Sequence, residues 1–334
     1  MSVLKRAAAL IWLIPVTWGQ TTDFSIRVDV SVVSVDVSVT TPDGRPVDGL
    51  KADDFQLFDN GVEQPLSYFD PADAPWNVYL LLDVSGSTED HRSFMQRVAS
   101  GFLRNARRGD RIAVGVFGTE AETILGWSTS GEVSARALDW TRRNVDEGTT
   151  GFYRSLGQVL EREFGEIRER RAVIVLTDGR DASLYQTIQQ QGRLRSAADD
   201  EDFQDLSKTA LRARIPVYFV AMNTDVNLQD DSGGNEYRSL RILYPESDTA
   251  ARYLEEVRLR MESIAGTTGG KVFLAGNPAE VVTLLEKATG ALGEAYSLGW
   301  IAQSTGGQES PRTIEVRVGH PEYSVRLSRS AYVP

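Results

Sequence analysis

The sequence contains no cysteine, and its only histidines are His91 and His320. Without cysteine the chain has no disulfide bond, thiolate zinc site, iron–sulfur cluster or cysteine nucleophile. Two histidines are too few for a histidine-rich metal site, and a Ser-His-Asp triad would have to use His91 as its base. A thiolate or histidine-rich metal site is therefore excluded.

Basic residues are also fewer than acidic residues. The 334 residues include 36 Lys and Arg against 47 Asp and Glu, a formal net charge of −11. A nucleic-acid-binding protein needs a basic surface that displaces counterions from the phosphates, so nucleic acid is not an expected partner. Apolar residues make up 41% of the chain, an ordinary globular composition that allows a sizeable hydrophobic core.

No apolar run reaches the ~20 residues that a transmembrane helix needs. The run Ala7–Trp18 follows two basic residues, and the small residues Thr17 and Gly19 stand at its end. This order is typical of a secretory signal peptide, which we predict over residues 1–19. We therefore expect an exported bacterial protein, periplasmic or extracellular, with no transmembrane segment beyond the signal peptide. An uncleaved membrane anchor is the alternative.

Alternation of apolar and polar residues predicts β-structure at both ends of the chain. Phe24–Val39 alternates in two phases with a bend at Val32-Val33, and Phe55–Phe69 is typical of a hairpin around Asn60-Gly61. Three strand-like runs follow near the C-terminus, at Tyr296–Gln303, Thr313–Val318 and Tyr323–Leu327. We expect the N-terminal segment, residues 20–75, to pair with residues 293–334 in one β-sandwich. The alternative is two separate small β additions.

In the middle of the chain, residues 76–292, the strict alternation of apolar and polar residues gives way to continuous apolar runs and helical spacing. Continuous apolar runs predict strands buried on both faces at Val78–Leu82, Ile112–Phe117, Ala172–Thr177 and Pro216–Ala221. Segments with helical spacing lie between them, among them Val133–Trp140 and Phe152–Ile167. Strands that alternate with helices predict an α/β domain of Rossmann-like type, with a mostly parallel sheet and helices on both faces. Ligands of such domains bind at the carboxyl ends of the strands.

Oxygen-bearing side chains gather after the strands of this predicted sheet. The three clusters are Asp83-Val84-Ser85-Gly86-Ser87, Glu147-Gly148-Thr149-Thr150-Gly151 and Thr177-Asp178-Gly179. Two aspartates and three hydroxyls taken from these three loops would form a site of oxygen ligands only. Such ligands suit Mg²⁺, with Mn²⁺ or Ca²⁺ as alternatives, and they do not suit zinc.

These motifs resemble the metal-ion-dependent adhesion site of von Willebrand factor type A domains, at Asp83, Ser85, Ser87, Thr150 and Asp178. The DVSGS sequence after one apolar strand and LTDG after another are typical of that site, and the resemblance covers residues 76–292. It implies that the serines and the threonine bind the ion, while the aspartates bind it directly or through water. It also implies that an acidic side chain of a partner protein completes the coordination shell.

The threonine ligand has two candidates, because Thr149 and Thr150 are adjacent. The family places an aromatic residue three positions after its threonine, which matches Tyr153 and favours Thr150. The flanks are similar to a narrower group, exported bacterial proteins with a VWFA-related domain, common in Acidobacteria. That similarity rests on Val35–Phe69, on YSLGW at Tyr296–Trp300 and on RSAY at Arg329–Tyr332.

We therefore expect a metal-dependent, adhesion-type protein-binding module. The alternative is a structural or assembly component of the cell envelope, in which the metal only stabilises the fold. An enzyme is not expected, because the chain has no G-x-S-x-G motif. Gly269-Gly270-Lys271 precedes a predicted strand, whereas a phosphate loop precedes a helix.

Two polar segments, residues 182–202 and 223–248, are predicted to be long loops on the face of the site. They would shape a partner surface or cap the metal. Asp181 is expected to be a solvated loop charge, and Trp76 and Trp300 are expected to pack where the two domains join.

Overall fold

The structure is a computed structural model of the 334-residue chain. It describes residues 31–85, 92–107, 109–129, 150–167, 170–222, 234–244, 248–293, 295–302 and 310–332. Every element named below belongs to the unit Ser31–Pro334. Some expectations fall outside the described residues, namely the signal peptide, Ser87, His91, Thr149 and the helix predicted over Val133–Trp140.

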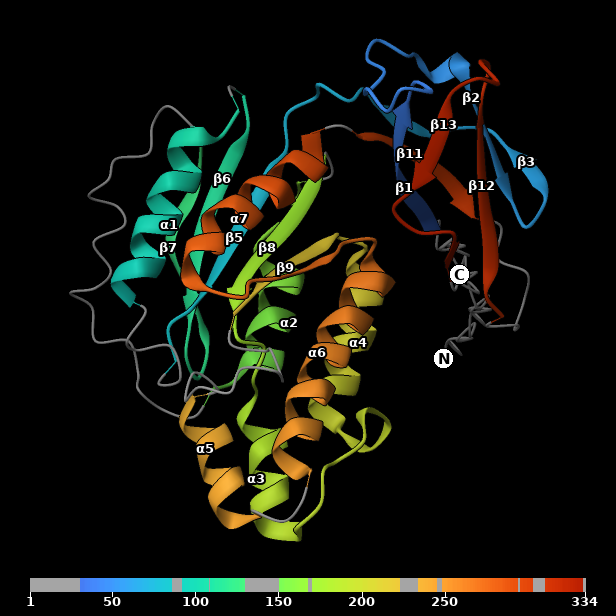
Figure 1. The fold of residues 1–334 in the computed structure, drawn as a ribbon. Helices are drawn as coiled ribbons and strands as arrows, with labels where there is room; N and C mark the ends of the chain where they lie inside the picture. Colours follow the sequence, from blue (N-terminus) through green and yellow to red (C-terminus); the bar gives the residue numbers. More distant parts are fainter. Residues whose placement is uncertain are drawn as a thin grey trace, which may run out of the picture. The chain divides into compact units, whose positions relative to one another are not determined.

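A six-stranded sheet forms the centre of the α/β domain, in the order β10-β9-β8-β5-β6-β7 (Figure 1). Its strands are β5 (Asn77–Asp83), β6 (Arg111–Phe117), β7 (Ala121–Thr129), β8 (Arg171–Thr177), β9 (Val217–Ala221) and β10 (Val272–Leu274). All pairs are parallel except β6 with β7, which lies at one edge. Every residue of β5 is buried, as expected for a central strand covered on both faces.

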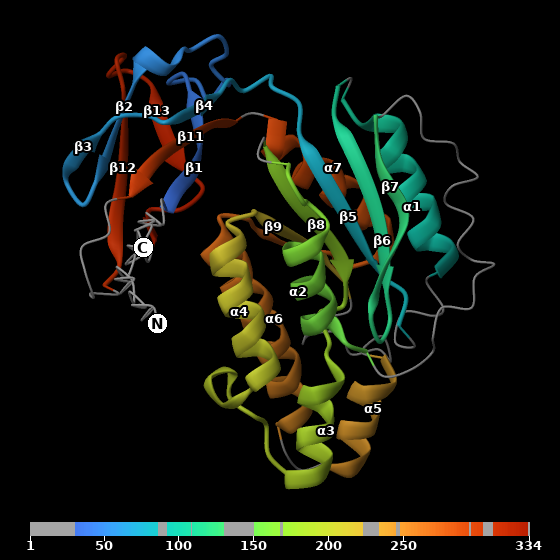
Figure 2. The ribbon, with the colours of Figure 1, turned by 180° about the vertical axis from the view of Figure 1, so that it is seen from behind.

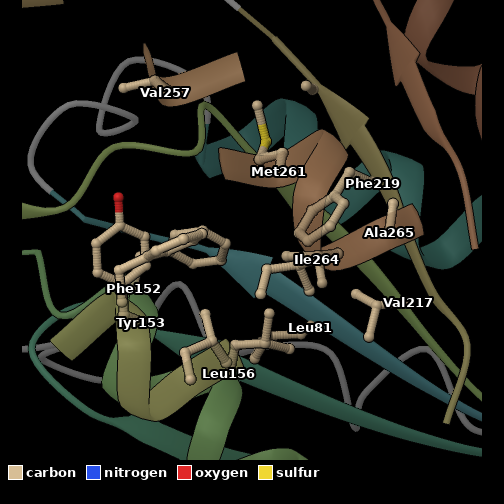
Figure 3. Close-up of a cluster of buried hydrophobic side chains, with 14 of the residues drawn as sticks. Leu81, Phe152, Tyr153, Leu156, Val217, Phe219, Val257, Met261, Ile264 and Ala265 are labelled. Carbon is tan, nitrogen blue, oxygen red and sulfur yellow. The ribbon is translucent and has the colours of Figure 1, made fainter. Parts of the chain in front are cut away.

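Helices cover both faces of this sheet (Figures 1 and 2). One face packs against α1 (Arg92–Asn105) and α7 (Pro278–Gly293). The core on the other face takes side chains from α2 (Phe152–Arg162), α3 (Ala182–Gln191), α4 (Glu201–Ala213), α5 (Gly234–Leu243) and α6 (Thr249–Thr268). Figure 3 shows part of this second core, where Phe152 of α2 and Met261 of α6 approach Phe219 of β9. No helix within the described ranges is long and apolar enough to cross a bilayer.

The predicted fold class is confirmed, but both predicted long loops are wrong in the residues that the structure describes. Gly234–Leu243, within the segment 223–248, form α5, and the segment 182–202 also contains a helix. Residues Ala182–Gln191 form α3, whose N-terminus is capped by Asp181. The carboxylate of Asp181 accepts a hydrogen bond from the backbone N–H of Ser183 at 2.9 Å. Leu184 and Ile188 give the helix a buried face. The many glutamines of this segment obscured a helix that is stabilised by its N-terminal cap and by two buried apolar side chains.

Strands from the two ends of the chain form two four-stranded sheets, β13-β1-β11-β4 and β14-β12-β2-β3. The N-terminal strands are β1 (Ser31–Thr40), β2 (Phe55–Asp59), β3 (Val62–Gln64) and β4 (Tyr68–Asp70). The C-terminal strands are β11 (Ala295–Ala302), β12 (Arg312–Val318), β13 (Ser324–Leu327) and β14 (Ala331–Tyr332). In the first sheet β1 pairs with β11 and β13, and in the second β2 pairs with β12. The α/β domain is thus inserted between strands of the same β-structure.

Two details of this β-structure differ from the sequence prediction. The register between β1 and β11 runs without interruption past Val32 and Val33, so the bend predicted there is absent. Trp300 lies in the core of the β-structure and not at the domain junction. Its indole N–H donates to Asp59 Oδ2 at 3.0 Å, which satisfies the polar end of a buried ring.

Arg170, which directly precedes β8, holds both connections between the β-structure and the α/β domain. Its buried guanidinium donates hydrogen bonds to five backbone carbonyls, those of Pro71, Ala72, Ala74, Leu292 and Ala295. The ring of Trp76 stacks against it, with 4.1 Å between Arg170 Cζ and the ring centroid. Trp76 therefore lies at the junction, where the sequence analysis expects it.

Candidate metal centre

The ends of two parallel strands bring the first and third predicted clusters together. Asp83 is the last residue of β5, and Thr177 is the last residue of β8. The two strands are hydrogen-bonded neighbours, with Leu82 opposite Leu176. The next residues, Asp83 and Thr177, therefore leave the sheet side by side, and Asp178 follows directly.

Both carboxylate oxygens of Asp83 accept hydrogen bonds from these clusters. Ser85 donates its backbone N–H at 3.1 Å and its hydroxyl at 2.6 Å to Oδ1. The hydroxyl of Thr177 donates to Oδ2 at 2.6 Å. A hydroxyl that gives its proton to a carboxylate has only lone pairs left for a further neighbour. The hydroxyl of Ser85 is therefore oriented by Asp83 and keeps lone pairs that a cation could use.

Asp178 is fully buried, and its two oxygens have different surroundings. Oδ1 accepts the backbone N–H of Arg180 at 3.1 Å. Oδ2 accepts no hydrogen bond from the described residues, and the guanidinium of Arg180 lies 3.7 Å from it. The turn between them passes through Gly179, which has a φ of +75°. A Cβ atom there would lie 2.6 Å from Met261 Sδ, so any other residue would force the Met261 side chain to move as well as straining the backbone.

Thr150, from the second cluster, precedes α2 and is buried. Two hydrogen bonds join its loop to the loop of Asp178. The carbonyl of Thr150 accepts the backbone N–H of Ala182 at 2.9 Å. Asp181 Oδ2 accepts the backbone N–H of Tyr153 at 3.0 Å. Asp181 therefore caps both α2 and α3, and the expectation that it is a solvated charge is wrong.

Of the five predicted ligands, four lie on loops at this edge of the sheet: Asp83, Ser85, Thr150 and Asp178. The fifth, Ser87, lies outside the described residues. No group of three His, Cys, Asp or Glu side chains with metal-binding geometry occurs in the part of the chain that the structure describes. A cation bound here would therefore have to use hydroxyl oxygens as well as the two carboxylates.

The electrostatics of the site favour a cation. Burial and the charge of Asp178 raise the pKa of Asp83 from its ordinary value of 3.8 to about 7, and the hydrogen bonds from Ser85 and Thr177 offset part of this rise. Two neighbouring buried carboxylates oppose each other's ionisation. A divalent cation would remove that repulsion and would satisfy Asp178 Oδ2. The donor set, carboxylate and hydroxyl oxygen, is the set that Mg²⁺, Mn²⁺ and Ca²⁺ prefer.

The sequence analysis missed two side chains of this site. Thr177 was seen only as one more oxygen donor, whereas the structure shows that it orients Asp83. Its place at the end of a strand next to β5 was the available signal. The burial of Arg180 had no such signal, because an arginine in a polar loop is usually exposed.

Comparison with known proteins identifies the central domain. The family model of the von Willebrand factor type A domain matches residues 77–256, from the start of β5 into α6. No curated protein sequence matches the chain.

Solved structures with a similar arrangement have low sequence identity to this chain. A von Willebrand factor type A protein from Catenulispora acidiphila is 12% identical over 92% of this chain and 74% of its own, with a TM-score of 0.45. The pilus adhesin SpaC from Lactobacillus rhamnosus GG is 12% identical over 83% of this chain and 47% of its own, with a TM-score of 0.44.

Proximal thread matrix protein 1 from the mussel byssus, described with a zinc-occupied MIDAS motif, is 14% identical over 65% of this chain, with a TM-score of 0.38. The chain spans about half the length of this mussel protein and of SpaC, 48% and 47%. The family match, in contrast, covers more than half of the chain described here. The protein belongs to the von Willebrand factor type A domain family.

Proposed function

We propose that this protein is a metal-dependent protein-binding module of adhesion type. A divalent cation, Mg²⁺ with Mn²⁺ or Ca²⁺ as alternatives, would be held by Asp83, Ser85, Ser87, Thr150 and Asp178. An acidic side chain of a partner protein would complete its coordination shell. The observation that carries the proposal is the buried pair Asp83 and Asp178, in which Asp178 Oδ2 accepts no hydrogen bond from the described residues.

The ion would supply the attraction between the two proteins. The chain carries a formal net charge of −11, which repels an acidic partner at long range. A bound divalent cation is the largest local charge in such a site, and it reverses the local repulsion. Binding of the partner should therefore require the metal ion, and a chelator that removes the ion should release the partner.

We further propose that the protein acts outside the cytoplasm and binds without catalysing a reaction. Residues 1–19 have the order of a secretory signal peptide, and the flanks resemble exported bacterial proteins with a VWFA-related domain. Expression with and without residues 1–19 tests export, because only the full chain should reach the periplasm or the medium.

Calorimetric titration of Mg²⁺ and Mn²⁺ into metal-stripped protein tests the metal site. We expect saturable binding that Asp178→Ala abolishes. Asp205→Ala is a matched control, because it removes a carboxylate that is exposed on α4. Metal binding that survives Asp178→Ala at full strength would contradict the proposal.

The open coordination position can be probed separately with bound Mn²⁺. A short peptide with one glutamate should displace a water molecule from the ion and lower the water-proton relaxation rate. The same peptide with glutamine should have a much weaker effect, because a neutral amide is a poorer ligand for a hard cation. Equal effects of the two peptides would argue against carboxylate recognition.

A structural role in the cell envelope is the second candidate function. Asp83 and Asp178 are fully buried, and Asp83 is hydrogen-bonded to two of the three loops, so a metal ion here would also stabilise these loops. Under this alternative Asp83→Ala lowers the melting temperature but leaves partner capture by the folded protein unchanged. Under the first proposal partner capture is lost as well.

A further inference from the structure

Arg180 is a buried cation next to a proposed metal ligand. Its side chain is 1% exposed, and one guanidinium nitrogen lies 3.7 Å from Asp178 Oδ2. This separation is longer than a hydrogen bond, so the contact is an ion pair across a short gap. The oxygen involved is the one that accepts no hydrogen bond within the described ranges.

The charge of Arg180 is permanent, because a guanidinium stays protonated in proteins. Placing it in the interior is costly unless an anion lies nearby. Asp178 is an anion at this place, and the charges of the two side chains compensate each other when no metal is bound. Burial also prevents Arg180 from reaching an incoming partner, so its effect on the site acts through Asp178.

A divalent cation on Asp178 would meet this guanidinium at close range. Two positive charges near one carboxylate repel each other, and the repulsion is weakly screened in a buried site. Metal binding would therefore have to displace the guanidinium or overcome its charge. In both cases the binding free energy of the metal is less favourable than it would be without Arg180.

We propose that Arg180 competes with the metal ion for Asp178, so that it stabilises the metal-free protein and lowers the affinity of the site for divalent cations. This inference rests on the proposed metal site. It assigns Arg180 a part in setting the metal concentration at which the site fills.

The test compares Arg180→Met with the wild-type protein, by calorimetric titration of Mg²⁺ and Mn²⁺ and by thermal denaturation with and without metal. Methionine keeps a long apolar side chain and removes the charge. We expect metal affinity to rise at least roughly tenfold, which corresponds to about 1.4 kcal/mol. The metal-free variant should melt at a lower temperature than the wild type, and saturating Mg²⁺ should narrow the difference.

Arg260→Met is the matched control. Arg260 is also a buried arginine, 2% exposed, and it pairs with Asp200 at 2.5 Å. Its loss should lower stability without changing metal affinity. Arg180→Lys keeps the charge and should bind metal like the wild type. If Arg180→Met does not fold, Arg180→Gln removes the same charge and retains hydrogen-bonding groups.

The outcomes separate this inference from the proposed function. One outcome is that the wild type binds metal and that Arg180→Met or Arg180→Gln binds it equally or more weakly. This would overturn the competitor role of Arg180 but would not contradict the metal site. Arg180→Lys behaving like Arg180→Gln would also overturn it, because charge would not be the cause. If neither the wild type nor the charge-removing variants bind either ion, the metal site is wrong and the competitor role is wrong with it.

Discussion

The hydroxyl of Thr177 donates a hydrogen bond to Asp83 Oδ2 at 2.6 Å, which joins the carboxyl ends of β5 and β8. The same hydroxyl accepts the backbone N–H of Gly179 at 2.8 Å. One side chain therefore orients a proposed metal ligand and holds the turn that carries Asp178. The first and third loops of the site are thus linked inside the protein, before any metal is bound.

Replacing Thr177 with valine tests this link. The variant keeps the shape of the side chain but removes the hydrogen bonds that the Thr177 hydroxyl makes with Asp83 Oδ2 and with the Gly179 N–H. We expect a loss of about 1–3 kcal/mol in the free energy of unfolding, measured by urea denaturation. Thr209→Val is the control, because its hydroxyl contacts Glu161 on the exposed surface. A loss no larger than that of the control would show that the link contributes nothing.

The metal-free protein should become less stable as pH rises from about 4 to about 7. The pKa of Asp83 is raised from 3.8 to about 7 by burial and by the charge of Asp178. In this pH range the folded state therefore binds more protons than the unfolded state, so stability falls as pH rises. The contribution is on the order of 2–4 kcal/mol.

This pH effect is isolated by subtracting the stability of Asp83→Asn, which lacks the titrating group, at each pH. The difference between wild type and variant should shrink or reverse toward pH 7 in metal-free buffer. Saturating Mg²⁺ should abolish the slope, because the ion favours the charged carboxylate. A difference that stays constant from pH 4 to pH 7 would contradict the raised pKa.

Gly179 and Gly192 form a matched pair for testing the turn of the third loop. Both have positive φ, +75° and +66°, but a Cβ atom at Gly192 meets open space, whereas one at Gly179 lies 2.6 Å from Met261 Sδ. Gly192→Ala should lower the free energy of unfolding only through the strain of a left-handed backbone, by roughly 1–2 kcal/mol. Gly179→Ala should cost about 1–3 kcal/mol more through the steric clash. Equal losses in urea denaturation would contradict the close packing of α6 against the turn.

Arg170→Met should weaken the attachment between the two domains. The substitution removes the Arg170 hydrogen bonds to five backbone carbonyls, including those of Ala72 and Leu292. We expect a loss of about 3 kcal/mol or more. Limited proteolysis should then cleave near residues 71–76 or 293–295 faster than in the wild type. Arg317→Met, which removes an exposed arginine, should leave both the stability and the cleavage pattern unchanged.

The sequence was sufficient to predict the α/β domain and the convergence of Asp83 and Asp178 at one edge of its sheet. Strands buried on both faces are continuously apolar, and Val78–Leu82 and Ala172–Thr177 show this pattern without ambiguity. Polar residues directly after such strands must meet at one edge of a parallel sheet, which placed Asp83 and Asp178 together. The helix Ala182–Gln191 was missed because its apolar face holds few residues and its cap, Asp181, also fits a solvated turn.

Local periodicity by itself determined the order of the buried strands in the α/β domain and, as a hypothesis, the insertion of this domain between β-strands. Composition determined the types of ligand available. Tertiary structure alone decided which strands pair at the two ends, such as β1 with β11, and which polar side chains are buried. Asp181, Trp300 and Arg180 differ from expectation for one physical reason. The burial of a side chain depends on residues that are distant in the sequence, and a local pattern contains no information about them.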